Sequence, residues 1–166
     1  MQLVSEDKFV GDINENAGII HKICNIYFTS LHDRQDAYQE ILYQLWRSYP
    51  AFKGDSKFST WMYKVALNTA ISYMKKSNRV RSDAILPGQL EHLAESNREQ
   101  GTHEKMQMLY TAINALSEID KAITLLFLED KSYEEISSIT GITKTNVSVR
   151  LVRIKKSLKE KLKNII

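Results

Sequence analysis

The side chains best able to do chemistry in this sequence are cationic groups, amides and aromatic rings, which occur in two groups. The first group lies near the end of the sequence. In the segment TKTNVSVRLVR, residues 143–153, Asn146 can pair with adenine and an arginine with guanine in the DNA major groove. An exposed Val149 can contact thymine methyl groups. Residues 141–166 hold eight Lys and Arg against one Glu, a net +7, so the earlier residues carry −4 of the total +3. A basic end on an acidic body indicates a polyanion partner, with a solvated helix face as the alternative.

A second group combines aromatic rings with cations and amides. The segment FKGDSKFST, residues 52–60, reads as a loop with two phenylalanines, and a helix is expected to follow it. Aromatic faces beside backbone cations are how proteins hold single-stranded nucleic acid. The alternatives are core-anchoring phenylalanines and a half-buried tryptophan beside solvated lysines. One side of this helix carries Trp61, Lys64, Asn68, Ser72 and Lys75, and the other, core-like side carries Met62, Val65, Ala66, Thr69, Ala70 and Tyr73.

Enzyme chemistry finds little support. The four histidines are scattered, and neither metal-ligand spacing nor a phosphate-binding loop occurs, so we expect no metal, no cofactor and no small-molecule substrate. The single cysteine, Cys24, lies in an apolar run and is expected to be a buried thiol in a reducing cytosol. No apolar run approaches the ~20 residues that span a bilayer, and the first residues lack a secretion signal. We therefore expect a cytoplasmic protein that is not an enzyme and does not insert into a membrane.

The elements that must position these side chains are helices. Two prolines and six glycines are few in a chain of 166 residues, which predicts an all-α fold of two small helical domains joined by a flexible linker. The first domain is expected over residues 1–76, the linker over 77–105 and the second domain over 106–166. The helices expected before the linker lie near Glu6–Ile13, Ala17–Thr29, Asp33–Tyr49 and Thr60–Lys76, and a short one is expected within the linker near Leu90–Glu95.

The second domain ends in a predicted helix-turn-helix. Ser132 followed by Glu135 forms a capping box, Gly141 allows a sharp turn, and Thr143 can cap the next helix. In that helix Val147, Leu151, Ile154 and Leu158 recur at the spacing of a buried stripe. The second helix of such a motif enters the major groove by its N-terminal residues. Its outward side presents Thr145, Val149, Val152, Arg153 and Lys156, flanked by Asn146 and Ser148.

Two long segments together resemble a known family. RQDAYQEILYQLWRSYPAFKGDSKFSTWMYKVALNTAISYMKK, residues 34–76, resembles the promoter-melting domain of the extracytoplasmic-function (ECF) sigma factors, a small group of the bacterial sigma-70 family. SYEEISSITGITKTNVSVRLVRIKKSL, residues 132–158, resembles the same family's −35-binding domain. The resemblance implies a transcription initiation factor that binds core RNA polymerase, recognises −10 and −35 promoter elements and promotes DNA opening. The resemblance also implies three kinds of partner: the β′ and β subunits of core RNA polymerase, promoter DNA and an anti-sigma factor.

The resemblance also implies roles for individual residues. Ala37, Ile41 and Leu45 should face inward in the helix that matches the family's polymerase-binding helix. The polymerase-docking side of that helix consists of Asp36, Gln39, Glu40, Tyr43 and Arg47. The implied −10 DNA contacts are Phe52, Lys53, Gly54, Asp55, Ser56, Lys57, Phe58, Trp61, Lys64, Asn68, Ser72 and Lys75. The implied −35 DNA contacts are Lys144, Thr145, Asn146, Ser148, Val149, Arg150 and Arg153.

The sequence departs from the usual patterns at three places. Ser117 follows Leu116 where proline is common in the family, and Ser137 stands where a small apolar residue is usual at the helix crossing of a helix-turn-helix. The start of the recognition helix reads Thr145-Asn146-Val147, which leaves the choice of −35 bases open.

A helix-turn-helix regulator that binds duplex operators without polymerase is the alternative function. Such a regulator would not require Trp61 and Asn68 on one side of a helix.

Overall fold

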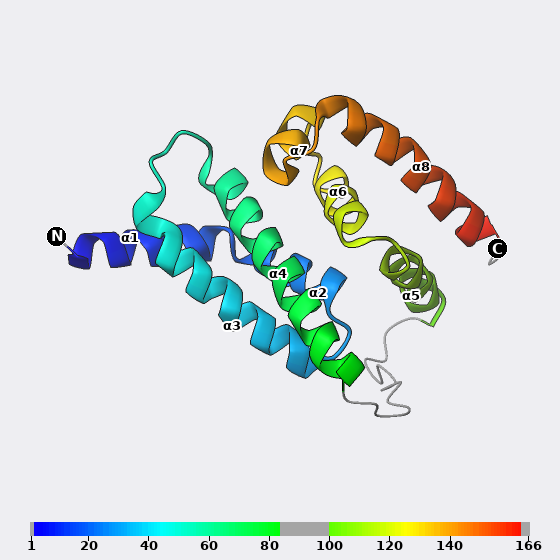
Figure 1. Ribbon diagram of the computed structural model, residues 1–166, viewed down its shortest axis with the longest axis horizontal. Coiled ribbons are helices and arrows are strands. Elements are labelled where there is room, and N and C mark those ends of the chain that lie inside the picture. Colours follow the sequence, from blue (N-terminus) through cyan, green and yellow to red (C-terminus); the bar gives the residue numbers. More distant parts are fainter. Residues whose placement is uncertain (1, 84–99, 164–166) are drawn as a thin grey trace. The chain divides into compact units, whose positions relative to one another are not determined.

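The computed structural model describes residues 2–83 and 100–163, and all regular elements in these ranges are helices (Figure 1). The chain divides into two compact units, residues 1–89 and 90–166. The predicted all-α fold of two helical parts, the second a helix-turn-helix, is confirmed. The short helix expected near Leu90–Glu95 lies outside the described residues.

The first unit is built around two long helices that run side by side, drawn in cyan and green in Figure 1. Its elements are α1 (Gln2–Glu15), α2 (Ala17–Tyr27), α3 (Leu31–Ser48), the short 3-10 helix η1 (Tyr49–Ala51) and α4 (Phe58–Asp83). Helix α2 contacts both α3 and α4, and these three helices enclose the core. The largest fully buried side chains of this unit are Ile20, Ile23, Ile41, Leu45 and Met62.

Helix boundaries differ from the sequence expectation at both ends of α4. The helix begins at Phe58 rather than Thr60, because the amide of Trp61 already donates to the Lys57 carbonyl at 3.2 Å. It continues to Asp83 rather than ending at Lys76. Residues 77–83 lack apolar periodicity, but no glycine or proline interrupts the chain before Pro87, so nothing there forces a helix to stop.

The buried side of α4 is also rotated from the expected one. Tyr63, Leu67 and Met74 are buried together with the expected Met62, Ala66 and Ala70. Val65, Thr69 and Tyr73, which were placed in the core, are only half-buried. The physical reason is that α4 packs against α2 as well as α3, so its covered arc is wider and centred further round than one apolar stripe indicates.

Two further features of the first unit agree with the sequence. Ala37, Ile41 and Leu45 are fully buried on α3, so the opposite side of that helix faces outward. Cys24 is buried, and burial raises the pKa of its thiol to about 11 despite the nearby Arg34 guanidinium. The thiol is therefore protonated at neutral pH and does not act as a nucleophile.

The second unit consists of α5 (Gln100–Asn114), α6 (Glu118–Leu128), α7 (Tyr133–Thr140) and α8 (Lys144–Lys163). Ser117 is the N-cap of α6, where its hydroxyl accepts from the Asp120 amide at 3.3 Å. Serine therefore serves well at the position where the family often has proline. Val147, Leu151 and Ile154 are buried as expected, whereas Leu158 is half-buried.

The helix-turn-helix is held by local hydrogen bonds. Ser132 and Glu135 form both bonds of the predicted capping box, at 3.1 and 2.9 Å. Gly141 has φ +76°, and the Thr143 hydroxyl accepts from the Asn146 amide at 3.2 Å. The unusual Ser137 donates to the carbonyl of Ile142 at 2.6 Å, which braces the turn from within. A small apolar residue could not make this bond, so the departure from the usual helix-turn-helix pattern has a structural role.

Replacing Ser132 with Ala is expected to destabilise the second unit by about 1 kcal/mol, because the hydroxyl that accepts from the Glu135 amide is lost. Urea unfolding followed by circular dichroism measures this change. Ser138, exposed in the interior of α7, offers the control. Its replacement by Ala is expected to leave stability unchanged or slightly raised, because alanine has the higher helix propensity. Equal losses in the two variants would contradict the role of the cap.

No helix in the described ranges is both long and apolar enough to cross a membrane.

Candidate nucleic-acid interface

Four aromatic rings from two segments of the first unit pack into one cluster, which we call the aromatic cluster. It consists of Tyr49 from η1, Phe52 just after it, and Phe58 and Trp61 from the start of α4. The ring centroids of Phe52 and Trp61 lie 5.1 Å apart, and those of Phe58 and Trp61 lie 5.4 Å apart. All four side chains are half-buried. The rings are therefore neither buried core anchors nor freely projecting. Trp61, predicted in the outward row of its helix, is half-buried, which agrees with the alternative interpretation.

Helix α1 supports the aromatic cluster from behind, a contact that the sequence did not reveal. Phe9 packs edge-on against Tyr49, with ring centroids 5.0 Å apart. The Tyr49 hydroxyl donates to Asp12 Oδ2 at 3.3 Å. Burial, together with the charge and hydrogen bond of Asp12, raises the pKa of Tyr49, so its hydroxyl stays protonated and remains a donor. The two partners lie thirty-seven positions apart in the sequence, too far for local pattern reading.

The loop that joins the two halves of the aromatic cluster is open to solvent. Its residues 53–57 are all exposed. Gly54 has φ +79°, a backbone conformation that other residues seldom adopt, and it shapes the turn. Phe58 and Ser59, expected in this loop, belong to the first turn of α4 because the aromatic cluster packs around Phe58. The exposed loop residues are Lys53, Gly54, Asp55, Ser56 and Lys57.

The outward side of α4 continues from this loop as a polar surface. Lys64, Asn68, Ser72 and Lys75 are all exposed, as the sequence predicted, and Trp61 stands at their N-terminal end. The structure thus brings the predicted −10 residues together: half-buried rings at one end, then amide, hydroxyl and ammonium groups. This combination offers stacking faces and phosphate-binding cations along one helix.

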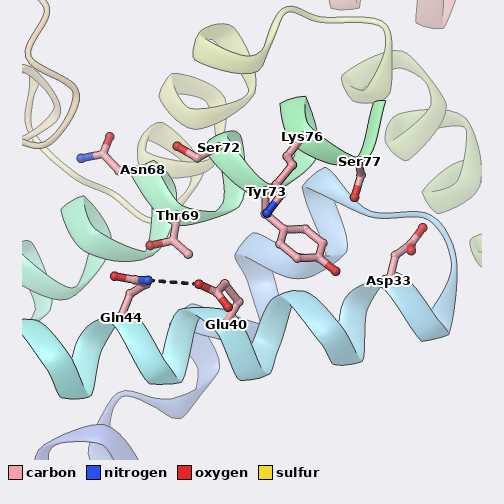
Figure 2. A pocket seen from close by; sticks show the side chains of 9 residues that line it. All are labelled: Asp33, Glu40, Gln44, Asn68, Thr69, Ser72, Tyr73, Lys76 and Ser77. Carbon is pink, nitrogen blue, oxygen red and sulfur yellow. Dashed lines mark hydrogen bonds between the residues drawn. The ribbon is translucent and has the colours of Figure 1, made fainter. Parts of the chain in front are cut away.

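A cleft of about 750 Å³ lies between α3 and α4, and Asn68 and Ser72 of this surface take part in its lining. Figure 2 shows Asp33, Glu40 and Gln44 on α3 opposite Asn68, Thr69, Ser72, Tyr73, Lys76 and Ser77 on α4. Glu40 is half-buried at the edge of the cleft, where its Oε1 accepts from the Gln44 side-chain amide at 3.0 Å. Gln44 was not among the predicted residues, although its spacing of four from Glu40 could have indicated the bond.

The rest of the predicted polymerase-docking side is open. Asp36, Gln39, Tyr43 and Arg47 are exposed, with 56% of Tyr43 accessible to solvent. His32 lies one turn before Asp36, and their side chains approach to 3.4 Å. Glu40 is the member that departs from the expectation of full exposure, because it faces the cleft.

On α8, most of the predicted −35 residues are exposed at its N-terminal half. Val149 is 48% exposed and Val152 is 67% exposed, and at a spacing of three residues they are neighbours on the helix surface. Ser148 is half-buried. The exposed members are Lys144, Thr145, Asn146, Val149 and Arg153.

Arg150 is placed differently from the other predicted −35 residues. It is half-buried, and its Nη1 donates to Asp120 Oδ1 on α6 at 2.9 Å. Sequence analysis did not identify Asp120, because thirty positions separate it from Arg150 and no spacing rule links them.

Among the described residues, no group of three or more His, Cys, Asp or Glu side chains is arranged to hold a metal ion.

Comparison with known proteins gives two matches to family models. Sigma-70 region 2 matches residues 13–80, and Sigma-70, region 4 matches residues 106–158. The first range includes the aromatic cluster and α3, and the second includes the helix-turn-helix.

Curated relatives match over most of their length. The ECF RNA polymerase sigma-E factor of Escherichia coli K12 is 30% identical over 159 residues, which cover 88% of this chain and 83% of that protein. The protein of the same description from Haemophilus influenzae is 29% identical over 169 residues, covering 92% of this chain and 84% of its own length.

Two solved structures share the fold. The sigma factor RpoE of Bartonella quintana, crystallised with the anti-sigma factor NepR, matches with a TM-score of 0.75 at 21% identity, covering 94% of this chain and 97% of that one. CnrH, in complex with the cytosolic domain of CnrY, matches with a TM-score of 0.70 at 12% identity, covering 96% and 90%.

Proposed function

The chain belongs to the ECF sigma factors of the bacterial sigma-70 family, and on that premise we propose how its residues divide the work of an RNA polymerase sigma factor. The first unit docks on core RNA polymerase through α3 and captures the −10 element. The second unit reads the −35 element through α8. The observation that carries this division is the aromatic cluster, with its open loop and the polar side of α4, in the same unit as the acidic side of α3.

The docking surface for core polymerase is the outward side of α3. Asp36 and Glu40 supply negative charge, and Tyr43 supplies an exposed ring. Such a surface suits a basic partner helix, for which the β′ coiled coil is the expected candidate. Charge complementarity there speeds association and fixes orientation. The full docking set is Asp36, Gln39, Glu40, Tyr43 and Arg47.

The −10 surface works by binding opened DNA better than closed DNA. A protein without an energy source can open a duplex only through such a difference in affinity. A flipped base stacks on aromatic rings for ~1–3 kcal/mol, which offsets the few kcal/mol needed to unpair it. The loop 53–57 beside the aromatic cluster receives this base, and Lys64, Asn68, Ser72 and Lys75 hold the strand that follows.

The −35 element is read in the major groove by the N-terminal half of α8. Asn146 and Arg153 supply hydrogen bonds to base edges, and Val149 contacts a thymine methyl group. Lys144, Thr145 and Ser148 contact the DNA backbone at the helix start.

Replacing the exposed Arg153 with Ala is expected to weaken promoter binding by ~1–3 kcal/mol and to relax preference at one −35 position, because a bidentate base contact is lost. Holoenzyme affinity for duplexes with each −35 base varied in turn measures this. Lys161, in the last turn of α8, offers a control of equal charge. Its replacement by Ala is expected to leave base preference unchanged. An Arg153 variant that matches wild type on every duplex would contradict the contact.

Two further assignments follow from the family. The likeness to sigma factors in complex with anti-sigma factors supports a proteinaceous inhibitor for this chain as well. We assign the chain to the cytoplasm, where core polymerase and promoters are, and to a role without catalysis of its own. Within the two units, we assign polymerase docking and −10 binding to a domain of residues 1–76 and −35 binding to a domain of residues 106–166, with 77–105 as the linker.

Transcription in a purified system tests the proposal. Core polymerase with this chain is incubated with duplexes whose promoter region is randomised, and transcripts are sequenced. Enrichment of two conserved elements at constant spacing upstream of the start site is expected. Under the alternative, a duplex-binding regulator, the chain alone would bind one element, and transcripts from core polymerase would not depend on it.

A further inference from the structure

We propose that Asp120 on α6 is a positioning residue for promoter specificity. It orients the Arg150 side chain toward a base edge of the −35 element, and its carboxylate cancels the positive charge of Arg150. The inference rests on the proposed −35 function of α8. It starts from a contact between two helices, Nη1 of Arg150 to Oδ1 of Asp120 at 2.9 Å. The side chains are 35% and 24% exposed, so the pair lies at the border between core and surface.

Asp120 is itself held in place. Its amide donates to the hydroxyl of Ser117, the N-cap of α6, at 3.3 Å. Its carbonyl accepts from the Thr124 hydroxyl at 2.7 Å. The carboxylate also stands in the first turn of α6, where the helix dipole stabilises negative charge. These two bonds fix the backbone of Asp120, and its side chain is short, so Asp120 is the steadier partner against which the longer Arg150 side chain is oriented.

Arg150 lies between the buried stripe of α8 and its outward side. It follows Asn146 by four residues and precedes Arg153 by three, so these three side chains form one line along the helix. A guanidinium has five donors in a rigid fork, and the pair with Asp120 uses one nitrogen. The remaining donors are free to meet a second acceptor, and guanine offers two in the major groove.

The charge of Asp120 selects the type of acceptor. A lone arginine binds phosphates of any sequence, and each neutralised phosphate contributes about 0.9 to the slope of log affinity against log salt. A carboxylate 2.9 Å away cancels that attraction and repels a phosphate. Arg150 in this pair therefore gains little from the DNA backbone and more from a neutral base edge. The pair therefore improves discrimination between −35 bases and lowers the affinity for DNA of any sequence.

Two variants of Asp120 separate aiming from charge cancellation. Asp120→Asn keeps the shape and a hydrogen-bond acceptor but removes the charge, whereas Asp120→Ala removes both. Affinity of the holoenzyme is measured for duplexes carrying the preferred −35 sequence and all its single-base changes, at several salt concentrations. Asp120→Asn is expected to steepen the salt slope by up to about 0.9 and to reduce discrimination less than Asp120→Ala does, because the hydrogen-bond acceptor remains. Asp120→Ala is expected to steepen the slope and to reduce discrimination at one position by roughly 5- to 100-fold.

Arg150→Ala and the double variant complete a thermodynamic cycle. Arg150→Ala is expected to lose discrimination at the same position as Asp120→Ala, and the double variant is expected to lose no more than Arg150→Ala. Glu160, exposed on α8 ten residues beyond Arg150, gives the matched control. Its replacement by Gln makes the same change of charge, and base discrimination is expected to stay as in wild type.

Three results would overturn the inference. In the first, Asp120→Ala keeps full discrimination. In the second, it weakens all duplexes equally and lowers the melting temperature, which would make the pair purely structural. In the third, Asp120→Asn leaves the salt slope of wild type unchanged. If instead the wild-type holoenzyme showed no −35 preference at all, the proposed function of α8 itself would fail.

Discussion

Replacing loop residues 53–57 with a Gly/Ser segment is expected to abolish transcription from duplex promoters while leaving affinity for core polymerase unchanged. The loop is exposed and lies beside the aromatic cluster, whereas the proposed docking side lies on α3. Without the loop, an unpaired base loses its binding site, and the few kcal/mol needed to unpair it are no longer offset. Run-off transcription and competition for core polymerase with wild-type chain measure the two quantities.

A template that is already open separates base capture from other defects. On a promoter with a mismatched −10 bubble, the loop variant is expected to regain part of its activity, because the unpairing has already been done. Gly54→Ala provides a graded control inside the same loop. Its added methyl group meets nothing within 4 Å, so the change acts only through strain at φ +79°. Its activity is expected to fall between those of the loop variant and wild type. Normal activity of the loop variant on duplex promoters would show that the loop does not capture a base.

Reversing two charges on α3, with Asp36→Lys and Glu40→Lys together, is expected to weaken binding to core polymerase by roughly 100-fold or more. Like charges placed opposite one another at an interface cost several kcal/mol. Stability should change little, because Asp36 is exposed and Glu40 loses a single hydrogen bond to Gln44 on its own helix. Competition binding to core polymerase and thermal unfolding measure the two effects.

Helix α1 offers a matched control for this charge reversal. Glu6 and Asp7 are both exposed, and replacing both with Lys makes the same change of net charge on another helix. Affinity for core polymerase is expected to stay near that of wild type in this control. An equal loss in both double variants would mean that overall charge, and not the outward side of α3, governs the affinity.

Local patterns predicted the helix-turn-helix in detail. The Ser132 and Glu135 capping box, the turn at Gly141 and the cap at Thr143 each depend on residues within a few positions, so sequence spacing determines them. The buried stripe of α8 follows from helical periodicity in the same way, except at Leu158 near its end. The resemblance to a family then related these local motifs to promoter binding.

Features that depend on contacts between distant segments were missed. The ion pair of Arg150 with Asp120 and the bond of Tyr49 to Asp12 join residues thirty or more positions apart. The buried side of α4 was misplaced because two neighbouring helices, α2 and α3, decide which arc is covered. Phe58 was expected in a loop, but its ring packs against Trp61 and Phe52 and the helix begins at Phe58. This packing could not be read from the sequence alone.

Permanganate oxidation of unpaired thymines on a duplex promoter tests most directly whether this chain opens DNA as a sigma factor. We predict reactive thymines in the −10 region of the non-template strand when the chain and core polymerase are both present, and none with either alone. Tight binding of the chain alone to the duplex, with no thymine becoming reactive when core polymerase is added, would contradict this function.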